Sequence, residues 1–435
     1  MNGVKTKKMV FLGLSGGVDS SVAALLLKEK GYEVIGIFMK CWGGPSAKSF
    51  DPELGTEGLG ADCTAHADAT DARRVAEKLG ISFYVWDFEE EYKRRVVDYM
   101  VEGYRRGETP NPDVMCNKEI KFGLFLERAL RMGGDCVATG HYVRITEQKN
   151  SVFGTHFARP ATRSLVLAAS SRRGGNHAEA AAGVSRNRVF SLFSAKDTNK
   201  DQSYFLWTLT QDQLAHCLFP IGDYLKSEVR EMARQAGLAT ADKKDSQGIC
   251  FLGRVRLDEF LGKYIKPKLG QVRLMERDGS YKIVGEHHGA HLYTIGQRHG
   301  IGLGGGTPYY VAEKDVKTNT LVVAPSATDQ SLYRKEIELT DINFIRPIAV
   351  SRGLAVHARV RYRQPLASAT LYQLPIMSLR DISRRETNYK LIFDEPVKFV
   401  APGQSAVFYS TDGPASASAS ADREMLGGGI IRYAN

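Results

Sequence analysis

The sequence predicts an α/β protein in which a parallel sheet flanked by helices is followed by two smaller units rich in β-strands. Apolar runs that suit buried strands alternate with helical patterns through about residue 145, which is typical of βαβ units. A glycine-rich turn joins the first expected strand to the first expected helix. Beyond about Leu257 the chain changes to short β-type runs bounded by Gly and Pro, which indicate small sheets or a barrel.

The α/β part of the chain contains four expected strands and five expected helices. Strands are expected at Met9–Leu14, Glu33–Met39, Ile81–Phe88 and Cys136–Ile145, and helices at Ser20–Lys30, Ala67–Leu79, Glu89–Arg106, Lys121–Met132 and Tyr224–Gly237. Gly31 and Gly80 stand where two of the helices end, because glycine readily adopts the left-handed conformation of a helix C-terminus.

The remaining β-type runs and the low-complexity segments define the expected domains. The runs are Lys282–Val284, Tyr309–Val311, Leu321–Val323, Ala355–Tyr362, Lys390–Phe393 and Ala406–Tyr409. We expect an α/β domain at residues 1–254, a small β-rich central domain at residues 255–335 and a C-terminal β-barrel at residues 336–435. Residues 146–191 are rich in Ser, Ala, Gly and Arg, so we expect a mobile insertion there and a shorter loop enlargement at residues 415–421.

Composition places the chain among globular proteins. Of its 435 residues, 43% are hydrophobic and 25% are charged. The formal charge of 59 − 49 = +10 fits a polyanionic partner. The longest apolar run near the start, Val22–Leu27, is far shorter than a membrane span, so we expect a cytoplasmic protein without a membrane partner.

The cysteines and histidines argue against a metal site. The six cysteines are Cys41, Cys63, Cys116, Cys136, Cys217 and Cys250. None forms a C-x-x-C pair, so neither a zinc ribbon nor a thioredoxin-type motif is expected, and the thiols of a cytosolic chain should be reduced. His287, His288 and His291 have no acidic companion beyond Glu286, and we expect no metal ion bound there.

The strongest motif is Ser15-Gly16-Gly17-Val18-Asp19-Ser20-Ser21, between a strand and a helix. Glycines allow close approach to an anion, and the N–H groups of the helix start point at it. No Gly-Lys-Ser/Thr follows, so this is not a Walker A loop; the alternative is an ordinary turn with Asp19 as a cap. The motif resembles that of the PP-loop ATP pyrophosphatases, which implies cleavage of ATP to AMP and pyrophosphate, with Mg²⁺ meeting Asp19.

Two further stretches each present a cysteine. Thr109–Lys118 holds two prolines, which should exclude a helix there, and then Cys116. Lys118 and Lys121 follow, and a thiol near ammonium groups and a helix start has a lowered pKa, as a nucleophile needs. The alternative is a buried structural cysteine. Asp245–Gly253 places Gly248 two residues before Cys250, which suggests a flexible loop that presents a thiol.

Together these stretches resemble the tRNA-specific 2-thiouridylases over most of the chain, including Tyr293–Arg298 and Pro402–Ala406. The resemblance implies that Cys116 is a nucleophile, Cys250 a persulfide carrier and Asp113 an acid/base. It implies ATP binding by Gly13, Leu14, Ser15, Gly16, Gly17, Val18, Asp19, Ser20, Met39 and Gly140. It implies contacts with tRNA by Asn111, Pro112, Asp113, His141, Lys200, Asp201, Gln202, Arg361, Tyr362 and Gln404, with the barrel as a tRNA-binding domain.

The resemblance implies that ATP adenylates the C2 oxygen of the wobble uridine and that a cysteine persulfide then supplies sulfur. The products are 2-thiouridine, AMP and pyrophosphate, and the partners are tRNA and a persulfide donor, with a monomer expected. Three alternatives remain open from the residues: a PP-loop ligase or amidotransferase acting on a small molecule, an iron–sulfur thiolase, and a non-catalytic RNA-binding protein. The absence of C-x-x-C argues against the second, and the intact Ser15–Ser20 loop argues against the third.

Overall fold

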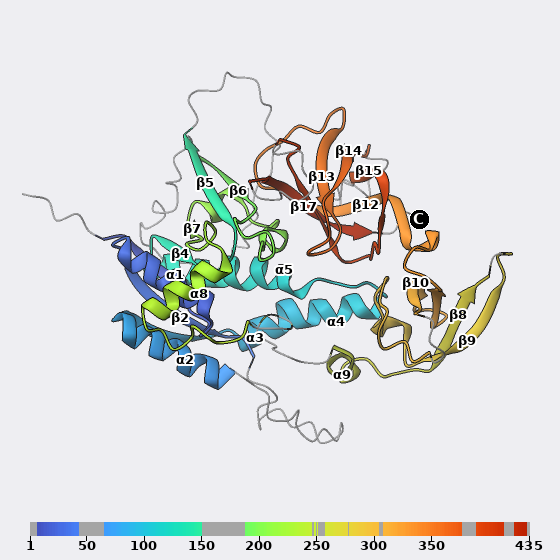
Figure 1. Cartoon of the computed structure of the whole chain (residues 1–435), viewed down its shortest axis with the longest axis horizontal. Coiled ribbons are helices and arrows are strands. Elements are labelled where there is room, and N and C mark those ends of the chain that lie inside the picture. Colours follow the sequence, from blue (N-terminus) through green and yellow to red (C-terminus); the bar gives the residue numbers. More distant parts are fainter. Residues whose placement is uncertain are drawn as a thin grey trace, which may run out of the picture.

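The structure is a computed structural model. It describes residues 7–42, 65–149, 188–245, 248, 250, 257–276, 278–303, 308–375, 389–412 and 422–432. Figure 1 shows a parallel sheet with its helices at one end, a barrel beside it and a smaller sheet at the far end. The predicted α/β class is confirmed. In this part of the chain, no helix is both long enough and apolar enough to cross a lipid bilayer.

The parallel sheet has the strand order β3-β2-β1-β4-β7, and all its pairings are parallel. Its strands are β1 (Met9–Gly13), β2 (Glu33–Lys40), β3 (Ser82–Asp87), β4 (Cys136–Ala138) and β7 (Cys217–Leu218). Side chains alternate between its two faces. Val10 and Leu12 pack into one core, whereas Phe11 packs into the other. Both faces are therefore covered, as a buried parallel sheet requires.

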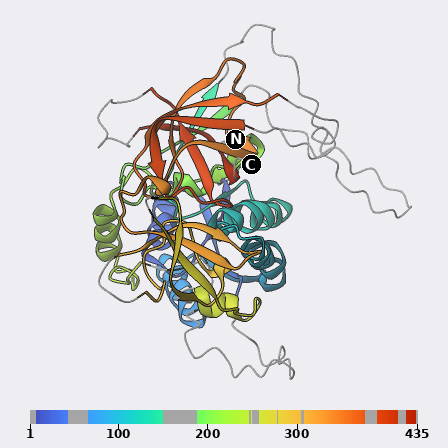
Figure 2. The ribbon, with the colours of Figure 1, turned by 90° about the vertical axis from the view of Figure 1, so that its right-hand side faces the viewer.

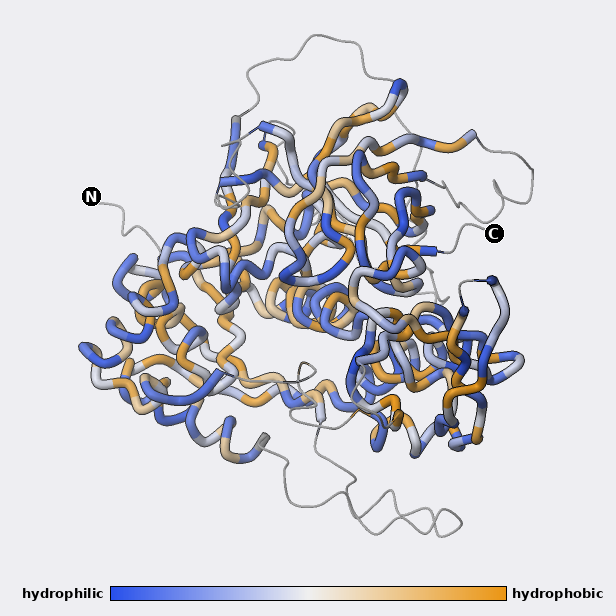
Figure 3. Tube along the Cα trace, turned by 45° about the vertical axis from the view of Figure 1, so that its right-hand side comes forward, coloured by the Kyte–Doolittle hydropathy of each residue, from blue (hydrophilic) through white to orange (hydrophobic). Residues whose placement is uncertain are grey.

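The helices of this region fall into two groups, one for each core. The first group is α1 (Val18–Glu29), α2 (Ala65–Leu79) and α8 (Lys226–Gln235). The second is α3 (Glu89–Tyr92), α4 (Asp98–Arg105), α5 (Pro112–Cys116) and α6 (Phe125–Arg131), with π-helical turns at Lys93–Val97 and Asn117–Leu124. A short helix, α7 (Gln211–Leu214), leads into β7. Figure 3 shows hydrophilic residues along the outer helices and hydrophobic residues toward the sheet.

Two predictions for this region are wrong in detail. The prolines do not exclude a helix, because Pro112 occupies the first turn of α5, where a missing N–H costs nothing. The expected strand Cys136–Ile145 is split into β4 and β5 (Arg144–Lys149), which belong to different sheets.

The barrel is closed by six antiparallel strands of the described chain, with β12 paired to both β15 and β17. They are β12 (Tyr333–Phe344), β13 (Leu354–Arg359), β14 (Ala367–Gln373), β15 (Tyr389–Lys398), β16 (Ser405–Tyr409) and β17 (Glu424–Arg432). β6 (Arg188–Phe193) pairs with β17, so the β5–β6 hairpin extends the barrel sheet. The predicted loop enlargement at residues 415–421 lies outside the described residues.

The smaller sheet has the order β10-β11-β8-β9. Its strands are β8 (Gly270–Met275), β9 (Tyr281–His287), β10 (Tyr310–Asp315) and β11 (Thr320–Ala324), preceded by α9 (Leu257–Gly262). Val272, Val311 and Leu321 form its core together with Ala401 from the barrel region. Figure 2 shows the barrel above the smaller sheet, and the smaller sheet in front of the helices.

The predicted insertion is narrower than residues 146–191, because β5 runs to Lys149 and β6 resumes at Arg188, directly opposite it. Residues 150–187 themselves lie outside the described residues. We expect that an Asn-Gly turn in their place raises the free energy of unfolding by about 2 to 3 kcal/mol, since a shorter loop costs less closure entropy. Urea unfolding measures this, with a Gly/Ser linker of the original length as the control. A less stable protein would contradict the prediction.

Candidate active site

The turn between β1 and α1 brings the predicted nucleotide-binding residues Gly13–Ser20 together. Ser15 N–H donates to Ser20 Oγ at 3.2 Å, and Ser20 Oγ donates to the Gly17 carbonyl at 3.1 Å. Gly17 occupies the N-cap position in an extended conformation and has no side chain with which to cap the helix. The N–H groups of the first turn of α1 can therefore bind an anion.

Close backbone approaches explain two of the glycines near this turn. Gly16 has a φ of +74°, and a Cβ there would lie 2.1 Å from the Asp68 carbonyl oxygen. A Cβ on Gly140 would lie 2.8 Å from the backbone nitrogen of Ser20. Met39, at the end of β2, lies beside Gly13. Met39 and Gly140, both predicted to bind nucleotide, thus border the same turn.

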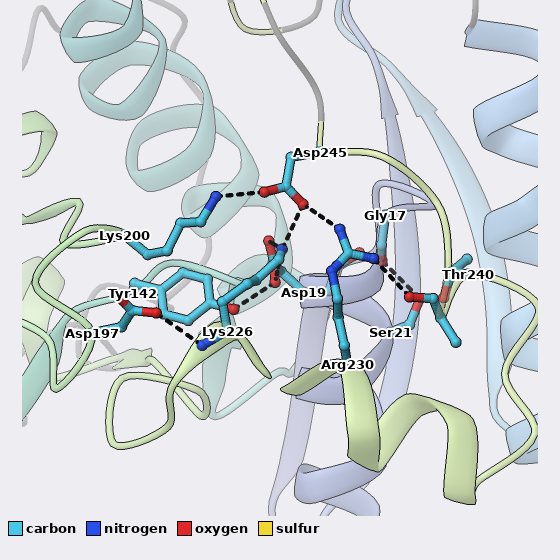
Figure 4. Close-up of polar contacts among 12 residues, drawn as sticks. Gly17, Asp19, Ser21, Tyr142, Asp197, Lys200, Lys226, Arg230, Thr240 and Asp245 are labelled. Atoms are coloured by element: carbon cyan, nitrogen blue, oxygen red, sulfur yellow. Dashed lines mark hydrogen bonds and ion pairs between the residues drawn. The ribbon is translucent and has the colours of Figure 1, made fainter. Parts of the chain in front are cut away.

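A cluster of ion pairs adjoins the turn (Figure 4). Lys226 Nζ donates to both carboxylate oxygens of Asp19, at 2.7 and 2.8 Å, and also pairs with Asp245 at 2.8 Å. Asp245 accepts from Lys200 at 2.6 Å and from Arg230 at 2.9 Å. Partial burial opposes the charge of Asp245, but the hydrogen bonds from Lys200 and Lys226 lower its pKa to about 2.

Tyr142 and Lys243 complete the surroundings of the turn. The Tyr142 hydroxyl donates to Asp19 at 2.8 Å. Lys243 Nζ donates to the Gly16 carbonyl at 2.9 Å and to Asp68 and Asp71 at 2.7 and 2.6 Å. Lys243 thereby braces the turn from the side of α2.

Cys116 and Cys250 form a second centre, and the structure brings them into direct contact although 250 − 116 = 134 positions separate them. Cys250 N–H donates to Asp113 Oδ1 at 2.9 Å, and the Tyr92 hydroxyl donates to the Cys250 carbonyl at 2.6 Å. Cys116 is fully buried, whereas Cys250 is half-buried. The predicted catalytic residues Cys116, Cys250 and Asp113 thus lie together.

Lys121 supplies positive charge to this pair of thiols. The hydrogen bond from Cys116 and the charge of Lys121 lower the pKa of Cys250 to about 7, against the effect of burial. Burial lowers the pKa of Lys121, but the neighbouring Cys250 and Cys116 sulfurs raise it by more than burial lowers it. The side chain therefore stays an ammonium. Burial also raises the pKa of Asp113, which suits a group that exchanges protons.

The prediction of a lowered pKa at Cys116 is wrong, because burial raises the pKa of this thiol well above its usual range. Cys116 is the last residue of α5, and the π-helical turn that carries Lys118 and Lys121 follows it directly. The thiolate of the pair therefore resides on Cys250. Cys41 is buried close enough to interact with Cys250, while Cys136 and Cys217 lie in β4 and β7. Cys63 lies outside the described residues.

Replacing Lys121 with Met should move the titration of Cys250 to higher pH. The hydrogen bond from Cys116 remains in this variant, but the pKa of Cys250, now about 7, must rise when the charge of Lys121 is removed. Thiolate absorbance, taken as the difference from Cys250→Ser protein, measures the midpoint. Lys118→Met is the matched control, because Lys118 is exposed and pairs with Glu119. An unchanged midpoint in Lys121→Met protein would refute the assigned role.

The residues predicted to contact tRNA lie in different settings. Asn111 Oδ1 caps α5 by accepting from Asp113 N–H and Val114 N–H at 3.1 and 3.2 Å, and Pro112 follows in the first turn. His141 is 7% exposed and bonded to Thr139, and Asp201 is 3% exposed and accepts from the backbone of Ser203. Protein thus encloses both side chains, and their contact with tRNA stays a prediction.

The other predicted contacts lie at or near the surface between the barrel and the α/β part. Gln202 accepts from Tyr142 N–H at 2.9 Å, and Tyr362 packs on Phe205 with ring centroids 4.5 Å apart. Arg361 donates to the carbonyl of Ile295. Arg361 and Tyr362 follow β13 in a turn, so they do not lie on a strand as predicted.

Thr109, in the loop between α4 and α5, contacts residues from the barrel region and from the smaller sheet. Its N–H donates to the Pro402 carbonyl at 2.7 Å, and its carbonyl accepts from Gln404 Nε2 at 2.8 Å. Lys314 of β10 approaches the Thr109 hydroxyl at 3.4 Å and donates to the Tyr293 carbonyl at 2.6 Å. Gln404 thus holds the residue that precedes the Pro110–Asp113 stretch. Burial lowers the pKa of Lys314 to about 7.

The structure also bears on the histidines near the end of β9. His287 and His291 are buried, and burial lowers the pKa of both. Among the residues that the structure describes, no group of three or more His, Cys, Asp or Glu side chains is arranged to hold a metal ion.

Sequence reasoning did not identify Lys226, Arg230, Tyr142, Tyr92 or Lys243 as site residues. The helix that carries Lys226 and Arg230 was predicted, but its pattern does not tell which polar residues face α1. Tyr142 stands beside Gly140 in the sequence, and this proximity was the available signal. The long-range contacts of Tyr92 and Lys243 left no local pattern.

Comparisons with known proteins agree with this arrangement. Family models match the tRNA methyl transferase HUP domain at residues 8–254, the tRNA methyl transferase PRC-barrel domain at residues 258–325 and the aminomethyltransferase beta-barrel domain at residues 334–431. A tRNA-specific 2-thiouridylase of Geobacillus kaustophilus is 39% identical over 432 residues, which cover 99% of this chain and 96% of the relative. Its counterpart in Enterococcus faecalis is 41% identical over 430 residues, covering 98% and 96%. One in Flavobacterium johnsoniae is 38% identical over 459 residues, covering 98% and 100%. The chain belongs to the tRNA-specific 2-thiouridylase family.

Proposed function

We propose that this chain is the sulfurtransferase that converts the wobble uridine of tRNA to 2-thiouridine, with ATP cleaved to AMP and pyrophosphate. The observation that carries the proposal is the pairing of Cys116 and Cys250 beside Lys121 and Asp113 in a protein that also holds an ATP-type loop. A ligase or amidotransferase acting on a small molecule needs no such pair of thiols.

The two centres lie at the same edge of the parallel sheet. Five positions (250 − 245 = 5) separate Asp245, which is bound at the loop, from Cys250, and this length of chain spans at most about 18 Å. Met39 borders the loop, and Cys41, two residues further on, interacts with Cys250. Both centres therefore lie near the carboxyl ends of β1 and β2, where open α/β sheets bind their ligands.

The loop residues Gly13–Ser20 would bind ATP through backbone N–H groups. Asp19 and the N–H groups of α1 offer the donor set that a magnesium–pyrophosphate group takes, and Mg²⁺ there would neutralise charge on the departing pyrophosphate. Adenylation makes AMP the leaving group at C2, because the C2 oxygen alone is a poor one. The base must leave its stack to reach the thiols, as in an exposed anticodon loop.

The thiol chemistry follows from the environment of each cysteine. Cys250 bears the terminal sulfur as a persulfide, and the ammonium of Lys121 stabilises the anion. Either the persulfide attacks C2 and Cys116 then attacks the Cys250 sulfur, or Cys116 first releases hydrosulfide, which attacks C2. Each route expels AMP and leaves a Cys116–Cys250 disulfide, which a two-electron thiol reductant resets. Asp113 acts as the acid/base that takes up and returns protons during these steps.

Further proposals concern the partners. The terminal sulfur comes from a persulfide-carrying donor, since none of the described groups generates it. The enzyme is proposed to act as a monomer, and the tRNA substrate supports action in the cytoplasm.

Nucleoside mass spectrometry of tRNA tests the proposal. Purified protein with ATP, a persulfide donor, reductant and unmodified tRNA is expected to yield 2-thiouridine and AMP in equal amounts. Omission of ATP should abolish both products. AMP formation that depends on a small-molecule acceptor and leaves tRNA unchanged would overturn the proposal.

A further inference from the structure

The loop between β1 and α1 has a feature that the proposed function does not explain. The segment Ser15–Ser21 contains no Lys or Arg, although pyrophosphate release builds up negative charge on the departing group. In a Walker A loop, a lysine within the motif meets this charge. Here the cation must come from another part of the fold.

Lys226 occupies the place from which that cation can act. It begins α8, which packs against α1 in the same core, so its side chain meets Asp19 in the first turn of α1 (Figure 4). Only 11% of the Lys226 side chain is exposed. A buried ammonium needs an anionic partner at all times, because an unpaired charge in such a place costs several kcal/mol.

The ion pairs of the cluster join three cations to two carboxylates, since Lys200, Lys226 and Arg230 pair with Asp19 and Asp245. A third carboxylate, that of Asp197, accepts from the Lys226 backbone N–H at 2.9 Å, so a further anion would bind the Lys226 ammonium by exchange with one of its present partners. Lys226 Nζ lies 2.7 to 2.8 Å from carboxylate oxygens of both Asp19 and Asp245. When another cation binds the Asp19 carboxylate, the Lys226 ammonium keeps its charge and pairs with the nearest other anion.

Lys243, the other lysine that touches the loop, is placed differently. Its ammonium lies between Asp68 and Asp71 and donates to the Gly16 carbonyl, so two carboxylates outweigh its single charge. It holds the loop from the side of α2 and adds no net positive charge. Lys226 and Arg230, the cations carried by α8, are therefore the ones suited to bind phosphate.

We propose that Lys226, with Arg230 beside it, binds the β- and γ-phosphates of ATP and the pyrophosphate product, and so supplies the cation that the loop lacks. This inference rests on the proposed function for the identity of the nucleotide. Asp19 and Asp245 hold the two cations in place, and the Asp19 carboxylate and a phosphate oxygen are alternative partners of the same ammonium.

Isothermal titration of the full-length protein tests the inference with inorganic pyrophosphate, ATP and AMP as separate probes in the presence of Mg²⁺. Lys226→Met is expected to weaken pyrophosphate and ATP binding by about 10- to 100-fold, the effect of losing one charged hydrogen bond. AMP lacks the two outer phosphates, so its affinity should stay within about twofold. Lys226→Arg should retain most of the affinity for pyrophosphate.

The matched control is Lys196→Met, because Lys196 pairs with Glu228 on the exposed side of the same helix. It should leave all three affinities unchanged. If Lys226→Met protein fails to fold, Arg230→Met carries the test and should weaken pyrophosphate binding several-fold but not AMP binding. Unchanged pyrophosphate affinity in folded Lys226→Met protein, or an equal loss for AMP, overturns the inference. Absence of 2-thiouridine with wild-type protein that binds pyrophosphate overturns the proposed function instead.

Discussion

Cys250→Ser protein treated with a persulfide donor is expected to carry no extra sulfur, whereas Cys116→Ser protein is expected to carry it on Cys250 and to form no 2-thiouridine. The difference follows from the surroundings of the two thiols. Cys250 is half-buried and its pKa is lowered to about 7, so its thiolate forms near neutral pH and can reach a donor. Cys116 is fully buried and burial raises its pKa, so it stays a thiol and does not compete for the donor's sulfur.

Peptide mass spectrometry without reductant locates the sulfur in the two variants, and nucleoside analysis measures turnover. Both variants should lose activity below detection, since neither route can finish without both thiols. Cys217→Ser is the control, because Cys217 is buried in β7 and should keep both properties. A persulfide found on Cys116 would reverse the assigned roles while leaving the reaction class intact.

Asp19→Ala should reduce ATP-dependent pyrophosphate release at least about a hundredfold in a protein that still folds. The carboxylate is the acidic group in the first turn of α1, and it orients Lys226 and the Tyr142 hydroxyl. The fold should survive, because Lys226 retains Asp245 as a partner.

Pyrophosphate release by the Asp19→Ala variant is measured with a coupled pyrophosphatase assay, beside thermal unfolding as a check on folding. Asp242→Ala is the control: Asp242 is 83% exposed and pairs with Arg234 on the outer side of α8. Wild-type rates of pyrophosphate release from folded Asp19→Ala protein would falsify the assignment of the loop.

The order of elements and the chemical motifs could be predicted because they are local. The strand–turn–helix that carries Ser15–Ser21 depends on apolar periodicity and glycine, both of which act over a few residues. Cys116 and Cys250 could be paired only through the family resemblance, since no local signal links positions so far apart. The environment of the two thiols could not be predicted from the sequence. The prediction placed the reactive thiolate on Cys116, but burial raises the pKa of Cys116, and Lys121 helps to lower the pKa of Cys250 instead.

Contacts between distant segments account for the other differences. Lys226 and Asp19 are 226 − 19 = 207 positions apart, and only the packing of α8 on α1 brings them together. His141 is a polar residue that could be expected at the surface. Phe122 and Phe219 nevertheless pack on its ring, at 5.9 and 6.4 Å between ring centroids. Pro112 illustrates a local error, because a proline that would break the middle of a helix is well placed at its start.

The contacts of Thr109 limit how the chain can be cut. A fragment that ended near residue 254 would lose Pro402 and Gln404, the partners of the Thr109 N–H and carbonyl, and also Lys314. It would also expose the edge of β6 that pairs with β17. Asp113 stands four positions beyond Thr109, so truncation would loosen the segment that holds the Cys250 amide. The barrel is therefore part of the scaffold of the thiol centre, and the catalytic portion would not be expected to survive as a freestanding module.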